Sequence, residues 1–66
     1  MTINLKVKIA RAALGISQKE LAERVGVSRQ TINAIEKGDS NPSVKLCTSI
    51  CKALGKTLDE LFWEAD

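Results

Sequence analysis

One face of an expected helix over residues 28–37 carries side chains that suit nucleic acid. With Ile32 and Ile35 set toward the protein interior and a turn of about 100° per residue, the outward face and its flanks are formed by Gln30, Asn33, Ala34, Lys37, Arg29 and Thr31. Gln and Asn can pair with adenine, and Arg with guanine, through two hydrogen bonds, while Lys and hydroxyl groups suit phosphate oxygens. An ordinary solvated helix face is the alternative. The lack of an acidic residue in this set, and the helix and turn expected before it, favour a surface for the DNA major groove.

The sequence as a whole gives little support for catalysis. The chain contains no histidine and no tyrosine, most carboxylates fall on expected solvated helix faces, and no glycine-rich phosphate loop is present. We therefore expect no enzymatic activity, no cofactor and no small-molecule ligand.

Cys47 and Cys51 are the two cysteines of the chain and are expected to lie four residues apart on one helix. Two thiols without a histidine are too few for a structural zinc site within one chain. Their nearly parallel side chains also do not suit a disulfide. We expect reduced residues in or near the core, with a redox role or a metal shared between subunits as the alternative. Free thiols, and apolar runs far shorter than the ~20 residues that span a bilayer, indicate a cytoplasmic protein without membrane partners.

The charge of the chain is unevenly distributed. The net charge is only +2, but residues 1–56 hold ten basic and four acidic residues, a net of +6. The remaining acids, Asp59, Glu60, Glu64 and Asp66, follow the last base, Lys56. This pattern predicts one face turned toward a polyanion and an acidic end turned away from it.

Five short helices are expected to position the outward face, in one all-α domain over residues 1–66. The expected helices run from Leu5 to Leu14, from the cap Ser17 to Gly26, from the cap Ser28 to Gly38, from the cap Ser43 to Leu54, and from Thr57 through Phe62. Ser17-x-x-Glu20 and Thr57-x-x-Glu60 are capping-box patterns, and glycines provide the stops. Helical spacing predicts a core from Val7, Ala10, Leu14, Leu21, Ala22, Val25, Val27, Ile32, Ile35, Leu46, Ile50, Ala53, Leu54, Leu58, Leu61 and Phe62.

The segment 17–38 is similar to the helix-turn-helix of the phage Cro and lambda-type repressor family. The matching residues are Gln18, Leu21-Ala22, Val25-Gly26-Val27-Ser28, Thr31-Ile32, Ile35-Glu36 and Gly38. Familiar stretches follow at Asn41-Pro42-Ser43, Ala53-Leu54-Gly55 and Leu58-Asp59-Glu60-Leu61-Phe62. The resemblance therefore covers about residues 5–62 and implies a compact five-helix bundle that binds double-stranded operator DNA as a homodimer.

The resemblance also implies roles for single residues. Base edges would be contacted by Ser28, Arg29, Gln30 and Asn33. Phosphates would be contacted by Gln18, Thr31, Lys37 and Lys45; for Gln18, the free N–H groups and dipole of a helix N-terminus give an independent reason. Arg11 and Glu36 would form a largely buried ion pair. Two departures from the family weaken the match, because Ala10 is smaller than the usual residue there and Ala34 cannot hydrogen-bond a base.

The C-terminal end provides a motive for dimerisation. Phe62 and Trp63 are the two aromatic residues, and a short domain has little core in which to bury both. We assign both residues to the dimer interface, and we expect Phe62 also to pack in the core. The ending Phe62-Trp63-Glu64 resembles a small stand-alone subset that includes the cytolysin repressor, in which the chain ends pair as short strands; such a two-stranded pairing is the alternative to a purely helical fold.

These features predict a sequence-specific transcriptional regulator, a homodimeric repressor that occludes a palindromic operator. The alternative is an antitoxin-like protein-interaction module with secondary DNA binding. Single-stranded RNA binding is disfavoured because no aromatic side chain lies on the basic face to stack a base.

Overall fold

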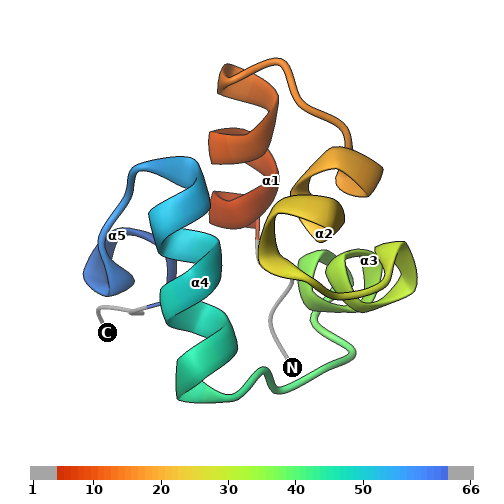
Figure 1. Ribbon diagram of the computed structural model, residues 1–66. Helices are drawn as coiled ribbons and strands as arrows, with labels where there is room; N and C mark the ends of the chain where they lie inside the picture. The colour runs from red at the N-terminus through yellow and green to blue at the C-terminus, as the bar shows by residue number, and fades with distance from the viewer. Residues whose placement is uncertain (1–4, 63–66) are drawn as a thin grey trace.

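The computed structural model describes residues 5–62, and five helices surround one core within this range (Figure 1). They are α1 (Leu5–Ala13), α2 (Gln18–Val25), α3 (Arg29–Lys37), α4 (Val44–Leu54) and α5 (Leu58–Phe62). The predicted all-α fold is confirmed, and no strand occurs between residues 5 and 62. The alternative, a two-stranded pairing of the chain ends, falls largely on residues 1–4 and 63–66, which lie outside the described residues.

Serine side chains fix where three of the helices begin. In each case the Oγ atom of the N-cap serine accepts a hydrogen bond from the backbone N–H three residues later, which has no partner inside the helix. The three bonds are Glu20 N to Ser17 Oγ at 3.0 Å, Thr31 N to Ser28 Oγ at 3.2 Å and Leu46 N to Ser43 Oγ at 3.1 Å. The predicted caps are therefore confirmed.

The two capping-box patterns differ in how their glutamates are used. Thr57 and Glu60 form the full reciprocal box, with Thr57 N donating to Glu60 Oε1 at 3.0 Å and Glu60 N donating to Thr57 Oγ1 at 3.2 Å. The bond from the Thr57 backbone N–H to its carboxylate, followed by the Thr57 side chain, holds the pKa of Glu60 below its ordinary value. Glu20 instead accepts from Arg24 Nη2 at 2.8 Å, one turn further along α2.

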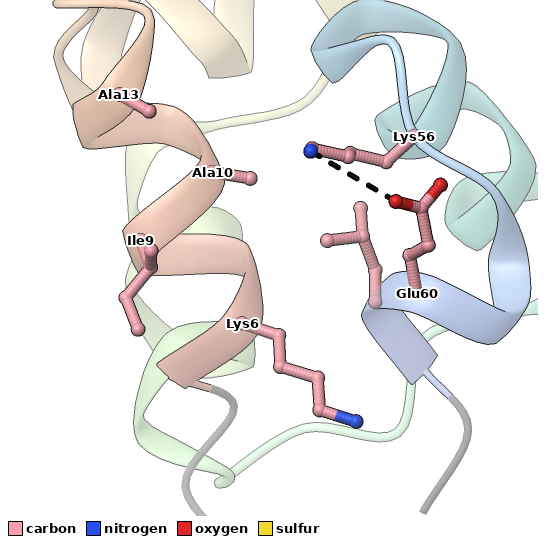
Figure 2. Close-up of a pocket in the computed structure, with 7 residues that line it drawn as sticks. Lys6, Ile9, Ala10, Ala13, Lys56 and Glu60 are labelled. Atoms are coloured by element: carbon pink, nitrogen blue, oxygen red, sulfur yellow. Dashed lines mark ion pairs between the residues drawn. The ribbon is translucent and has the colours of Figure 1, made fainter.

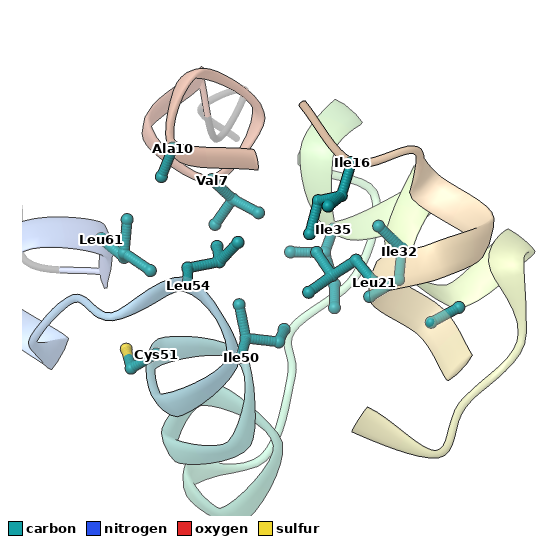
Figure 3. Packing of buried hydrophobic residues seen from close by; sticks show 11 residues of the cluster. Val7, Ala10, Ile16, Leu21, Ile32, Ile35, Ile50, Cys51, Leu54 and Leu61 are labelled. Carbon is teal, nitrogen blue, oxygen red and sulfur yellow. The ribbon is translucent and has the colours of Figure 1, made fainter. Parts of the chain in front are cut away.

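The core joins all five helices (Figure 3). Its buried members are Val7, Ala10, Ile16, Leu21, Ala22, Ile32, Ile35, Ile50, Cys51, Leu54 and Leu61. Partly buried apolar side chains pack against this cluster: Val25, Val27, Leu46, Ala53 and Phe62. Most of the predicted core is thus present. The partly buried side chains at its edge belong to residues that were expected in the core itself.

Two core predictions are wrong, and both concern residues at helix ends. Leu14 is 51% exposed because α1 ends at Ala13 and Leu14 falls in the following turn; Ile16, 8% exposed, fills the core there instead. Leu58 is 42% exposed at the first residue of the five-residue α5, whose buried side chain is Leu61. Helical spacing cannot show that an element stops before its last expected apolar residue.

Both cysteines are buried, as predicted for core residues, and no disulfide joins them. Burial raises the pKa of the Cys47 thiol and of the Cys51 thiol, and for Cys51 the neighbouring Cys47 and Glu60 raise it further. Among residues 5–62, no group of His, Cys, Asp or Glu side chains is arranged to hold a metal ion. None of the five described helices is long and apolar enough to cross a membrane.

We expect both thiols to react with iodoacetamide at least about tenfold more slowly in the folded protein than in denaturant. The thiolate is the reactive form, so a raised pKa lowers its fraction at any pH below that pKa, and burial blocks access. Mass spectrometry over a time course measures the two rates. Equal rates in folded and denatured protein would contradict the burial of Cys47 and Cys51.

Candidate nucleic-acid interface

α2 and α3 form a helix-turn-helix around a left-handed glycine. Gly26 has φ +78°, a conformation that L side chains rarely adopt, and its N–H donates to Ala22 O at 2.9 Å. The chain changes direction over Gly26 and Val27, and the next residue, Ser28, caps α3. Buried residues of both helices hold the pair against the core. In Figure 1, α3 lies at one side of the bundle and α5 at the other.

The outward face of α3 borders two hollows. The first, about 340 Å³, is lined by Arg29, Gln30 and Asn33. The second, about 520 Å³, is lined by Leu5, Lys8, Gln18, Asn33, Glu36, Lys37 and Asp39. Asn33 therefore stands between the two. Lys8 of α1 and the acidic Asp39 also lie at this surface, and neither was expected there.

The four residues expected at base edges differ in exposure. Arg29 and Gln30 are exposed in the first turn of α3, and Asn33 is half-buried one turn later. The hydroxyl of Ser28 is already engaged, since Ser28 Oγ accepts from Thr31 N and also lies 3.0 Å from Thr31 Oγ1. Ser28 thus has the predicted role of cap at the start of α3, and the contact between its hydroxyl and that of Thr31 was not predicted.

A buried ion pair lies beneath this face. Arg11 Nε donates to Glu36 Oε2 at 2.8 Å and Arg11 Nη2 donates to Glu36 Oε1 at 3.2 Å. The Glu36 side chain is 4% exposed and that of Arg11 is 13% exposed. Arg11 Nη1 also donates to the Ile16 carbonyl at 2.9 Å, so the guanidinium ties α1, the turn after it and α3 together. The pair that the resemblance implied is present.

Gln18 belongs to the same network, which sequence reasoning missed. Its Nε2 atom donates to Glu36 Oε1 at 3.0 Å and to Asn33 Oδ1 at 3.3 Å. Both N–H bonds of the amide are used within the protein. The expected phosphate contact of Gln18, which rests on the backbone N–H groups at the N-terminus of α2, stays a prediction. A signal existed in the sequence: Asn33 and Glu36 are three residues apart on α3, so a side chain that meets one can meet the other.

The remaining expected site residues lie away from these hollows or on their rim. Lys37 is exposed at the end of α3 and lines the larger hollow. Lys45 is exposed in the first turn of α4 and lines neither hollow. Phe62 is half-buried against the core, and Trp63, its expected partner at the dimer interface, lies outside the described residues.

Comparisons with known proteins agree with this arrangement. Residues 7–61 match the model of a helix-turn-helix family. The chain is 53% identical over 58 residues to the HTH-type transcriptional regulator YgzD of Bacillus subtilis strain 168, covering 88% of each chain. It is 47% identical over 57 residues to an HTH-type transcriptional regulator of Methanocaldococcus jannaschii, covering 86% of each. The crystal structure of the restriction-modification controller protein C.AhdI from Aeromonas hydrophila superposes with a TM-score of 0.85 at 30% identity, over 91% of each chain.

Proposed function

Because the chain belongs to the helix-turn-helix family of transcriptional regulators of the Cro and lambda-repressor type, we propose that it represses transcription by binding a palindromic operator as a homodimer. In this proposal residues 1–66 form a single DNA-binding domain, and α3 enters the major groove. Regulation by occlusion needs no further domain, since a dimer seated on a promoter excludes polymerase.

The observation that carries the proposal is the outward face of α3. Arg29 and Gln30 are exposed at the N-terminal end of the helix, and Asn33 continues the same face. Recognition helices contact base edges with residues of this part of the helix. Arg offers a bidentate donor to guanine and Gln a donor and acceptor pair to adenine, so two adjacent side chains discriminate between base pairs.

The dimer contact is proposed at α5 and the groove beside it. Figure 2 shows α1 and α5 facing one another across a groove of about 260 Å³, lined by Lys6, Ile9, Ala10, Ala13, Lys56, Glu60 and Leu61. Ile9 at this groove is 65% exposed, and Leu58 on α5 is 42% exposed. A partner that covers these apolar side chains together with Phe62, the last residue of α5, and Trp63, the next residue in the sequence, would leave α3 free for DNA. Two-fold symmetry would then place the recognition helices about 34 Å apart.

Gel-shift titration against fragments of the source genome tests the proposal. A regulator should retain a few discrete fragments at protein concentrations that leave the others unbound, in the presence of excess competitor DNA. Weak retention of all fragments alike, lost as salt is raised, would contradict it and favour the antitoxin-like interaction module.

Lys37→Ala should weaken binding to specific and random DNA alike. Lys37 is exposed on the rim of the larger hollow, and a lysine that contacts phosphate contributes through charge, independent of base sequence. The slope of log Kd against log salt should fall in magnitude by about one unit per subunit. Lys52→Ala, which removes the same charge from the last turn of α4, is the matched control and should leave the slope near the wild-type value. An unchanged slope for Lys37→Ala would remove Lys37 from the phosphate contacts.

A further inference from the structure

We propose that the DNA-binding surface extends onto α1, where Lys8 contacts a backbone phosphate across the hollow that Lys37 lines from α3. The proposal deepens the proposed function and rests on it, because it requires that α3 faces DNA. It brings to the interface a residue that lies outside the helix-turn-helix. It also gives the larger hollow an occupant, one stretch of the sugar-phosphate backbone.

The larger hollow, about 520 Å³, is lined by residues of both α1 and α3. Lys8 lines it from α1, and Asn33 and Lys37 line it from α3. Asn33 lies three residues after Gln30 and four before Lys37, so these three side chains share one face of the helix. Lys8 therefore borders the surface that is proposed to meet DNA, although it belongs to a different helix.

The buried ion pair fixes the position of Lys8 relative to α3. Arg11 follows Lys8 by three residues, so the two side chains are neighbours on α1. Arg11 is held to Glu36 of α3 at 2.8 and 3.2 Å, and to the Ile16 carbonyl at 2.9 Å. Glu36 directly precedes Lys37 in α3. The contact that packs α1 on α3 thus holds the two lysines at a fixed spacing across the hollow.

The charges at the hollow favour an anion. Lys8 and Lys37 are exposed, and neither forms an ion pair with a residue that the structure describes. Two acids also line the hollow; Glu36 is paired with Arg11, whereas Asp39 is exposed. Two lysines against one unpaired acid leave a net positive charge, which attracts a phosphate. Asp39 opposes the same phosphate and should weaken its binding.

Salt titration of the operator complex, followed by fluorescence anisotropy, tests the proposal. Lys8→Ala should lower the magnitude of the slope of log Kd against log salt by about one unit per subunit, and Lys8→Ala/Lys37→Ala by about two, since each lost phosphate contact releases fewer counterions. Random DNA should show the same changes, because phosphate contacts do not depend on base sequence. Lys8→Arg keeps the charge, and Lys52→Ala removes one from α4; both controls should keep the wild-type slope.

Two further measurements locate the contact. In a set of operators that each carry one neutral methylphosphonate in place of a phosphate, one position should weaken binding of wild type but not of Lys8→Ala. Asp39→Asn should tighten binding to operator and random DNA by the same factor, because it removes a charge that repels phosphate, and the gain should shrink as salt is raised.

The proposal is overturned if Lys8→Ala keeps the wild-type slope, if Lys8→Arg loses as much slope as Lys8→Ala, or if every methylphosphonate weakens wild type and Lys8→Ala alike. An Asp39→Asn variant that binds no more tightly than wild type would place the DNA outside this hollow. A partly unfolded variant shifts log Kd by a constant, so the slope separates a lost contact from a lost fold. Failure of the proposed function looks different, since wild type would then select no fragment over random DNA.

Discussion

Replacing Arg11 with alanine is expected to lower the free energy of unfolding by about 3–5 kcal/mol, the largest effect of any single substitution considered for this chain. Arg11 holds both oxygens of Glu36, at 2.8 and 3.2 Å, and the Glu36 side chain is 4% exposed. The variant would leave that carboxylate buried without its counter-charge. In a domain of this size each kcal/mol lowers the melting temperature by about 4–8 °C, so thermal unfolding followed by circular dichroism measures the loss.

The chain contains a matched control for this experiment. Arg24 pairs with Glu20 at the same 2.8 Å, but both side chains are 47% exposed. Arg24→Ala should therefore cost less than about 1 kcal/mol. The double variant Arg11→Ala/Glu36→Ala should recover part of the loss, because no orphaned charge remains. A melting temperature for Arg11→Ala equal to that of Arg24→Ala would show that the buried pair does not stabilise the fold.

Replacing Arg29 with alanine is expected to raise Kd for the operator by about 5- to 150-fold, equivalent to about 1–3 kcal/mol, and to relax the preference at one base pair. Arg29 is exposed at the first residue of α3 and lines the hollow with Gln30 and Asn33. An arginine there can donate two hydrogen bonds to guanine, and alanine can donate none. Anisotropy titrations against the operator and its single-base variants measure both effects.

Random DNA provides the control for Arg29. If the side chain reads a base, the variant should lose much less affinity for random DNA than for the operator, since random binding depends on phosphate charge alone. Equal losses on both would place Arg29 among the phosphate contacts with Lys37. Circular dichroism should give Arg29→Ala a fold like wild type, because the exposed side chain lies outside the core.

The helices and their bounds could be predicted because the signals are local. A cap serine and its N–H partner are three residues apart, and apolar spacing of three and four residues identifies the buried side of α3. The outward face of α3 follows from the same spacing, so Arg29 and Gln30 could be placed on it from the sequence. The error at Leu58 arises where α5 begins and the error at Leu14 where α1 ends; the end of α1 places Ile16 rather than Leu14 in the core.

The network beneath α3 could not be derived from the residues alone, because its members come from three segments. Arg11 and Glu36 are 25 residues apart, and Gln18 and Asn33 are 15 apart. Helical spacing alone predicts that Glu36 is an acidic residue at the surface. Only the resemblance predicts that it pairs with Arg11. Position at a helix N-terminus suggested a phosphate contact for Gln18, whereas the packing of α2 on α3 gives its side chain two partners inside the protein.

Selection of bound sites from a random double-stranded DNA pool tests the central claim most directly. The account predicts enrichment of one inverted repeat whose half-site centres lie about 10 base pairs apart, bound by two copies of the chain. A selected pool without a shared motif, retained through charge and released as salt is raised, would contradict sequence-specific binding by α3.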